Sequence, residues 1–204
     1  DLNIYQDLPK LLSISLGSAE TTLLNLTSAY STFVNGGLKV NPTLISRIQD
    51  RRGKTIYVPA LSGKCVGCDK FIIAGEMPSI KKDNLKIFSE QTAYQITSIL
   101  EGVVKRGTGK KLRDLNVPLA GKTGTTNNNF DAWFIGFTSN LVIGVYVGYD
   151  NPKTLGKYET GSKAALPIFK DFVKRSIYKD EFKNFPIPKG IYLSLIHISE
   201  PTRL

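Results

Sequence analysis

Seven residues near the middle of the 204-residue chain, at positions 120 to 126, combine one lysine with glycines and threonines in the order Ala-Gly-Lys-Thr-Gly-Thr-Thr. A Gly-Lys-Thr triplet occurs in phosphate-binding loops, which also need a glycine five residues before the Gly-Lys pair and a helix directly after it. Position 116 is Asn116 instead, and the residues from Asn127 to Phe130 make a poor helix start. The run is therefore not a phosphate-binding loop, and another chemistry has to be sought for Lys122.

The same run resembles the Lys-Thr-Gly strand of serine acyl-transfer enzymes, a class that includes penicillin-binding proteins and β-lactamases. This resemblance implies that Lys122 helps to anchor a substrate carboxylate and lowers the cost of proton movement. Thr123 and Thr125 would donate hydroxyl hydrogen bonds to that carboxylate, and Gly124 would let an extended substrate backbone approach. The N–H of Thr125 would be an oxyanion-hole donor, typically worth about 3 kcal/mol. Lys122 and Thr125 are thus candidate catalytic residues, and the candidate substrate-binding residues are Lys122, Thr123, Gly124, Thr125 and Thr126. The alternative is an ordinary exposed strand lysine.

Histidine usage restricts the chemistry further. The one histidine, His197, lies in the stretch from Leu193 to Leu204, which resembles translated sequencing-adapter read-through. We interpret residues 193–204 as a non-native tail. Without that tail, a Ser-His-Asp triad, a Cys-His pair or a histidine-bearing metal site is excluded within the segment. Proton transfer would depend on lysine, a carboxylate, tyrosine or cysteine. The acyl-transfer reaction that the resemblance implies requires neither a metal nor an organic cofactor.

The two cysteines, Cys65 and Cys68, form a Cys-x-x-Cys pair in a loop-like stretch. Four ligands of this kind would predict a zinc site, but one pair does not. We favour a disulfide between them, as expected in an oxidising compartment, over an inert reduced pair. A metal or redox role ranks last, because no thioredoxin-like βαβ pattern surrounds the pair.

The composition, with 41% hydrophobic residues, predicts one globular unit with a core of ordinary size. The formal net charge is +10, which could indicate nucleic-acid binding. The basic clusters, however, are short pairs without interleaved aromatics, at Arg51-Arg52, Lys81-Lys82 and Lys110-Lys111. Such pairs favour a solvated surface over nucleic-acid binding. They would also suit an anionic membrane or polymer at close range. No stretch approaches the roughly 20 apolar residues of a membrane span, and we interpret Asp1 as an internal cut.

Three stretches have the apolar spacing of amphipathic helices. The first follows the candidate N-cap Thr22 and stops at Asn35, and the second runs from a Ser89 cap to Gly107. The third covers residues 164–178. Its inward face is predicted to consist of Ile168, Phe169, Phe172 and Val173.

Strands are predicted over residues 43–48, 55–58, 117–126, 132–137 and 141–149. The first two form a small hairpin around a turn at 50–53, and the last two form an antiparallel hairpin because only Ser139-Asn140 separate them. Residues 59–78 contain both cysteines and have no sustained periodicity, so they are predicted to be a loop excursion. The sequence therefore predicts an α+β fold, with helices packed against an antiparallel sheet.

A longer resemblance, to the class A penicillin-binding proteins or bifunctional peptidoglycan synthases, covers nearly everything before Leu193. It is carried by LGSAETTLLNLTSAYSTFVNGG, by LEGVVKRGTGKKL, and by the run from GKTGTTNNNFDAWFIGF to KAALPIFKDF. It implies that residues 1–192 are the C-terminal part of a transpeptidase domain with the serine β-lactamase and D,D-peptidase fold. It also implies that Thr126, Asn127, Asp131 and Trp133 lie at or behind the floor of the site, although for Trp133 an ordinary core position is the favoured interpretation.

The activity implied by the resemblance is D,D-transpeptidation, which cross-links peptidoglycan stem peptides from a D-Ala-D-Ala donor to an amine acceptor and is trapped by β-lactams. In the family the nucleophilic serine, its lysine and the Ser-x-Asn motif precede the segment that begins here at Asp1. This chain alone is therefore expected to be inactive. A membrane anchor and a glycosyltransferase domain are likewise expected upstream, which would place the domain in the periplasm or at the outer face of the cytoplasmic membrane. Two alternatives stay open, a serine β-lactamase or D,D-carboxypeptidase-type hydrolase and a noncatalytic binding module of the same fold.

Overall fold

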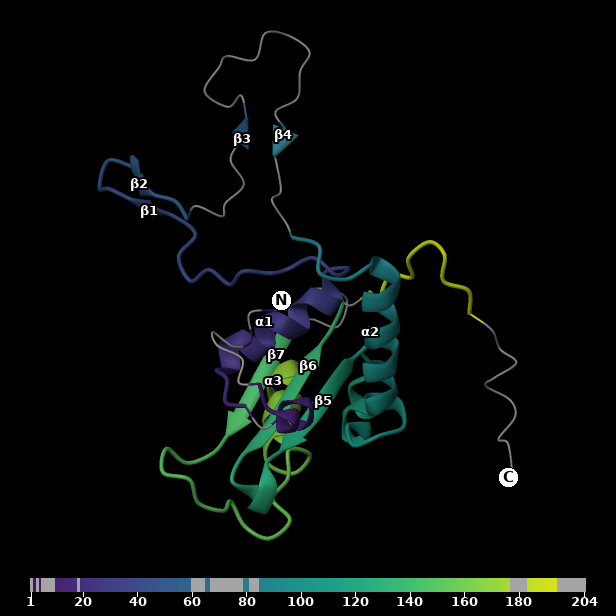
Figure 1. Ribbon diagram of the computed structural model, residues 1–204. Helices are drawn as coiled ribbons and strands as arrows, with labels where there is room; N and C mark the ends of the chain where they lie inside the picture. Colours follow the sequence, from purple (N-terminus) through teal and green to yellow (C-terminus); the bar gives the residue numbers. More distant parts are fainter. Residues whose placement is uncertain are drawn as a thin grey trace.

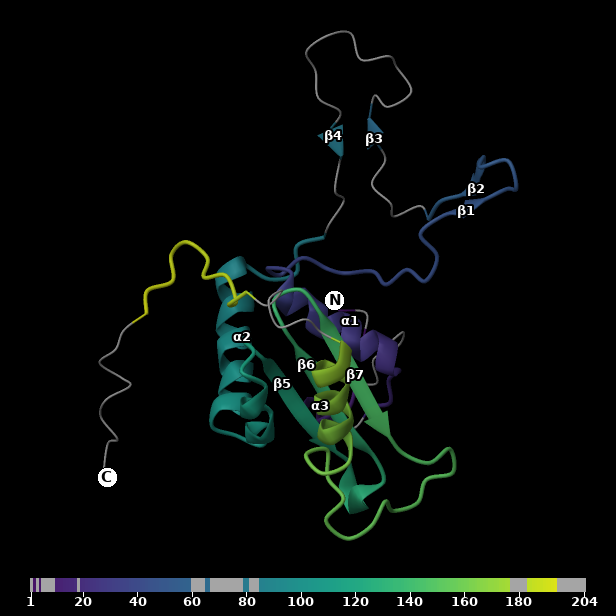
Figure 2. The ribbon, with the colours of Figure 1, turned by 180° about the vertical axis from the view of Figure 1, so that it is seen from behind.

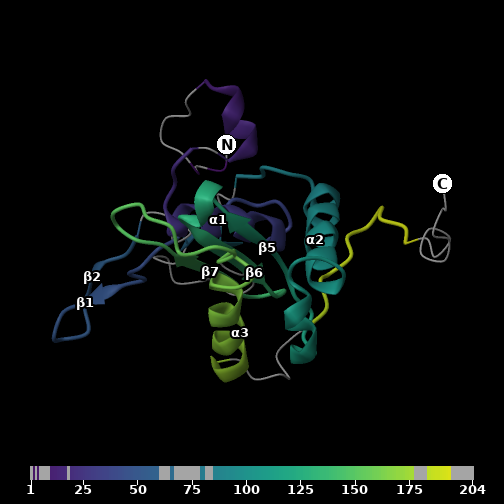
Figure 3. The same cartoon turned by 90° about the horizontal axis from the view of Figure 1, so that it is seen from below.

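The computed structural model describes residues 2, 4, 10–17, 19–59, 65–66, 79–80, 85–176 and 183–193 (Figure 1). Its centre is a three-stranded antiparallel sheet of order β5-β6-β7, formed by Ala120–Thr125, Ala132–Phe137 and Val142–Val147. Helices α1 (Leu23–Val34) and α3 (Ala165–Ser176) cover opposite faces of this sheet (Figure 3). The predicted α+β fold is confirmed.

The helix α2 (Glu90–Lys105) lies beside β5, as the ribbon seen from behind shows (Figure 2), and it also packs on α1. Both predicted caps are formed: Thr22 accepts a hydrogen bond from the N–H of Asn25, and Ser89 accepts one from the N–H of Thr92. Each cap satisfies one backbone donor that a helix N-terminus leaves unpaired. In both helices, the cap residue and the apolar stripe that follows it therefore predict correctly where the helix begins.

The helix α1 ends at two glycines with positive φ, Gly36 and Gly37. A Cβ on Gly37 would lie 2.2 Å from the carbonyl oxygen of Phe88, so no other residue fits without a backbone shift. The carbonyl oxygen of Gly37 accepts from the N–H groups of Ile87 and Phe88. This close approach ties the end of α1 to the chain that enters α2.

The strands differ from the prediction mainly in length. The predicted strand over 117–126 is confirmed over Ala120–Thr125 as β5, and residues 117–119 belong to the link that joins it to a preceding 3-10 helix, η2 (Lys110–Leu115). The predicted strand over 43–48 is wrong except at its end, because β1 covers only Ile48–Gln49 and pairs with β2 (Thr55–Tyr57). The turn between β1 and β2 is confirmed, with Asp50 accepting from the N–H groups of Arg52 and Lys54. Two further short elements complete the order, η1 (Leu12–Leu16) and η3 (Asn127–Asn129).

The core lies between the sheet and α3, where Phe134 and Phe169 are fully buried with ring centroids 4.8 Å apart. The prediction for the inward face of α3 is half wrong. Phe169 and Val173 are buried, whereas Ile168 is 52% exposed and Phe172 is 48% exposed. Leu166 takes their place in the core. Residues 166, 169 and 173 follow the spacing of three and four that defines one helix face, and residues 168 and 172 are rotated away from it.

Part of the predicted loop excursion over 59–78 lies outside the described residues. Within it, Cys65–Val66 forms β3, which pairs antiparallel with β4 (Ser79–Ile80). The predicted Cys65–Cys68 disulfide cannot be assessed, because Cys68 is outside the described part of the chain, as are residues 194–204 of the predicted tail. Among the helices of the described ranges, none has the length and apolar character of a membrane span.

Candidate active site

The predicted site residues lie along β5, which forms one edge of the sheet. Lys122 is opposite Ile135 of β6, Thr123 is opposite Phe134, and Gly124 is opposite Trp133. Lys122, Thr125 and Thr126 are exposed, while Thr123 and Gly124 are half-buried. The structure therefore brings all five predicted substrate-binding residues together on one accessible strand end.

The hydrogen-bond pattern of β5 directs the amide of Thr125 outward. Just beyond the strand, the N–H of Thr126 donates to the carbonyl oxygen of Asp131 over 3.2 Å, which marks these two residues as a hydrogen-bonded pair. Such pairs alternate with non-bonded pairs along an antiparallel ladder. The N–H and C=O groups of Thr123 and Thr125 therefore point away from β6. An N–H in that position can donate to a group that approaches the strand edge.

The ammonium group of Lys122 lies along the same edge, where its Nζ donates to the carbonyl oxygen of Thr123 over 2.7 Å. Lys122 takes part in none of the salt bridges found in the described part of the chain, which are Lys105–Glu101, Lys170–Asp114 and Arg175–Asp171. An exposed cation without a carboxylate partner can bind an anionic group of a ligand.

Each threonine side chain of the run has a defined partner. Thr123 Oγ1 lies 3.0 Å from Thr108 Oγ1, and Thr125 Oγ1 accepts from the N–H of Gly161 over 3.0 Å. Thr126 Oγ1 accepts from the N–H of Asp131 over 2.8 Å. The hydroxyls are thus held in place by groups from outside the strand, and sequence analysis did not identify Thr108 or Gly161. Thr108 follows the predicted helix stop at Gly107 and lies in the run LEGVVKRGTGKKL that carries the family resemblance.

Two of the residues predicted at the floor lie next to the end of β5. Trp133 is on β6, and Asp131 immediately precedes β6. The Tyr146 hydroxyl donates to Asp131 Oδ1 over 2.8 Å, and the Trp133 and Tyr146 ring centroids are 4.6 Å apart. This hydrogen bond raises the pKa of Tyr146 above its usual value, because it holds the phenol in its neutral form. Tyr146 was also missed, since only the β6–β7 register places it opposite Trp133. Asn127 belongs to η3 at the far side of Thr126.

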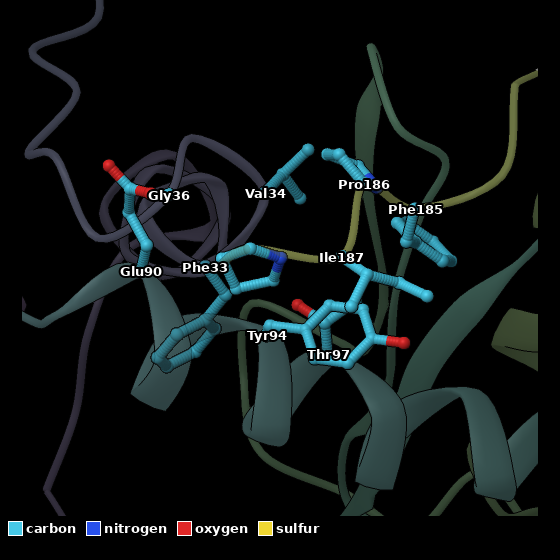
Figure 4. A pocket seen from close by; sticks show the side chains of 10 residues that line it. Phe33, Val34, Gly36, Glu90, Tyr94, Thr97, Phe185, Pro186 and Ile187 are labelled. Carbon is cyan, nitrogen blue, oxygen red and sulfur yellow. The ribbon is translucent and has the colours of Figure 1, made fainter. Parts of the chain in front are cut away.

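Two hollows of the described surface lie away from β5. One, of about 240 Å³, is between the end of α1, the start of α2 and residues 185–188, with Phe33, Tyr94 and Ile187 among its lining (Figure 4). The other, of about 490 Å³, lies between η2 and α3. There Lys170 donates to Asp114, and this hydrogen bond lowers the pKa of the Asp114 carboxyl. Neither hollow includes a residue of the run from Lys122 to Thr126.

Residues 8–174 match the family described as penicillin binding protein transpeptidase domain. The chain is 46% identical over 188 residues to penicillin-binding protein 1A of Rickettsia prowazekii, covering 90% of this chain and 24% of that protein. It is 35% identical over 215 residues to penicillin-binding protein 1A of Pseudomonas aeruginosa, covering 91% of this chain and 26% of that protein. The chain therefore spans about a quarter of the length of these curated relatives.

The fold is similar to that in the crystal structure of penicillin-binding protein 1A from Haemophilus influenzae. The TM-score is 0.63 at 28% sequence identity, and the similarity covers 85% of this chain and 29% of that one.

Proposed function

Since the chain belongs to the penicillin-binding protein transpeptidase family, we propose that it supplies the substrate-binding strand of a peptidoglycan D,D-transpeptidase. The observation that carries the proposal is the geometry of β5. Its edge presents one cation, Lys122, together with the hydroxyls of Thr123 and Thr125 and an outward N–H. These groups match what a peptide that ends in a carboxylate would need.

The substrate is a stem peptide that ends in D-Ala-D-Ala, lying extended along β5. Its terminal carboxylate accepts hydrogen bonds from the hydroxyls of Thr123 and Thr125 and is attracted by the Lys122 ammonium group. Gly124 leaves the strand edge without a side chain, so the substrate backbone can come close. The carbonyl of the penultimate D-Ala lies near the N–H of Thr125, which stabilises negative charge on its oxygen.

The reaction is acyl transfer through a serine. The serine oxygen attacks the penultimate carbonyl, its proton passes to a nearby base, and the C–N bond to the last D-Ala breaks as that amine takes up a proton. A neighbouring stem then supplies an amine that attacks the acyl-serine, forms the cross-link and releases the serine. A β-lactam enters by the same first step, but its leaving amine stays attached. Lys122 favours these proton movements because its positive charge lies beside the reacting groups.

The second half of the site, with the nucleophilic serine, its lysine and a Ser-x-Asn motif, lies in our proposal upstream of Asp1 in a longer protein. The share of its relatives that the chain covers supports this, because it spans about a quarter of their length. We also propose a membrane anchor in that upstream part, with the domain acting outside the cytoplasm, because the resemblance to class A penicillin-binding proteins implies both.

The proposal predicts that this chain alone is not acylated. Incubation with a fluorescent penicillin, followed by denaturing electrophoresis, should give no covalent label on the isolated chain. The complete protein that carries it should be labelled, because it contains the serine. Heat-denatured complete protein is the control, since its label must disappear if a folded site is required. Labelling of the isolated folded chain would contradict the placement of the serine outside it, and an unlabelled complete protein would contradict the proposed function.

A further inference from the structure

The two threonine hydroxyls of β5 are each contacted by a group from a connection outside the sheet. Thr108, in the link that follows α2, contacts Thr123 at 3.0 Å between hydroxyl oxygens. Gly161, in the link that precedes α3, donates its N–H to Thr125 Oγ1 over 3.0 Å. The proposed binding role of Thr123 and Thr125 does not explain why both hydroxyls have such a partner.

A hydroxyl has one proton to donate and two lone pairs that accept. Because a backbone N–H can only donate, Thr125 accepts from Gly161 and keeps its own proton for another acceptor. In the pair of Thr108 and Thr123, either hydroxyl can donate. A bound carboxylate only accepts, so it would take the proton of Thr123, and Thr123 would then accept from Thr108. Gly161 therefore leaves the Thr125 proton for an anion, and Thr108 can donate to Thr123 once an anion accepts the Thr123 proton.

We propose that Thr108 and Gly161 are positioning residues that fix the hydroxyls of Thr123 and Thr125 as donors to the terminal carboxylate of the peptide or β-lactam. This inference rests on the proposed function. Neither residue touches the ligand in this proposal. Each acts through one threonine: Gly161 leaves the Thr125 proton available before the ligand arrives, and Thr108 donates to Thr123 when the carboxylate accepts the Thr123 proton.

The backbone around Gly161 is built for this contact. Gly161 is buried, and a Cβ placed on it would lie 2.4 Å from the carbonyl oxygen of Trp133 and 2.6 Å from that of Gly124. Real Cβ atoms essentially never come so close to backbone atoms, so only glycine brings its N–H to Thr125 at this place. The contact therefore depends on the absence of a side chain.

Thr108 is held by its neighbours. The N–H groups of Gly107 and Gly109 both donate to the carbonyl oxygen of Val103 over 3.0 Å, at the end of α2. A Cβ on Gly107 would lie 3.0 Å from the Cα of Val103, which leaves little room for another residue. The two glycines thus fix the residue between them relative to α2, and α2 lies beside β5. The Thr108 hydroxyl reaches Thr123 because this link is rigid on both sides.

The test compares two probes in the complete protein, benzylpenicillin with its free carboxylate and benzylpenicillin methyl ester. For Thr108→Val, which keeps the shape but removes the hydroxyl, the second-order acylation rate constant should fall about tenfold with the free carboxylate, the effect of one hydrogen bond. It should change less than about twofold with the ester, which lacks the anion. Thr108→Ser restores the hydroxyl and should restore the rate. The matched control is Thr43→Val, at an exposed position away from β5.

A second variant tests the other contact. Gly161→Ala should also lower acylation by the free carboxylate more than acylation by the ester, because the added Cβ displaces the N–H from Thr125. An equal loss with both probes, in either variant, means a merely structural role and overturns the inference for that residue. Unchanged rates with both probes overturn it as well. If the unsubstituted protein is acylated by neither probe, the proposed function itself fails before any variant is compared.

Discussion

Replacing Lys122 by alanine in the complete protein should lower the rate of acylation by penicillin about 100-fold or more, the size expected when a group that assists proton transfer is removed. Lys122 is exposed at the edge of β5, and its Nζ contacts the backbone of Thr123. In the proposed site, its removal deletes the cation that would attract the ligand carboxylate and stabilise charge during acyl transfer, but it removes no core contact. Stopped-flow acylation with a fluorescent penicillin measures the rate.

Lys54→Ala is the matched control, since Lys54 is an exposed lysine in the β1–β2 turn. It should leave the acylation rate unchanged. The thermal unfolding midpoints of both variants should stay close to that of the unsubstituted protein, because exposed substitutions usually change stability by less than about 0.5 kcal/mol. Unchanged acylation in Lys122→Ala would make Lys122 an ordinary surface lysine and remove the central residue of the proposed site.

Replacing Phe169 by alanine should reduce the free energy of unfolding of this chain by about 3 to 5 kcal/mol, the range measured for buried phenylalanines. The ring is fully buried between α3 and β6, with its centroid 4.8 Å from that of Phe134. It also occupies the space over Gly136, where a Cβ would lie 2.5 Å from the ring. No neighbouring side chain can fill the resulting cavity without moving the sheet or the helix. Urea unfolding followed by circular dichroism measures the change.

Phe172→Ala provides the control on the same helix, with the same chemical change at a ring that is 48% exposed. Its cost should stay below about 2 kcal/mol, because only part of the ring leaves an apolar environment. Equal costs for the two variants would show that both rings are buried to a similar extent. That result would agree with the sequence prediction and contradict the structure.

The family and the elements nearest the site were predictable because their signals are local. Thr22 and Ser89 act as caps within three residues of their partners, and the pairing of β6 with β7 follows from a two-residue connection. The resemblance to class A penicillin-binding proteins is confirmed by the match over residues 8–174 and by the similarity to penicillin-binding protein 1A. The run from Lys122 to Thr126 lies on and just after β5, within the strand predicted over residues 117–126, and its binding role stays a prediction.

The contacts that complete the site could not be predicted, because they join residues far apart in the sequence. Thr108 and Thr123 are 15 positions apart, and Thr125 and Gly161 are 36 apart. Only the packing of α2 and α3 around the sheet brings these pairs together. The prediction of the inward face of α3 was half wrong for a related reason. The helix carries more apolar residues than one face can bury, and the position of the helix on the sheet determines which of them are buried.

The pairing of Trp133 with Gly124 has an optical consequence. Trp133 is the one tryptophan of the chain, and its indole ring lies directly across the ladder from the middle of the Lys-Thr-Gly run. A Cβ on Gly124 would be 3.1 Å from that of Trp133, so the indole borders the space above the glycine. All tryptophan fluorescence of this segment therefore originates beside β5. Its emission is a built-in reporter of what happens at the edge of β5, and no attached dye is needed to observe it.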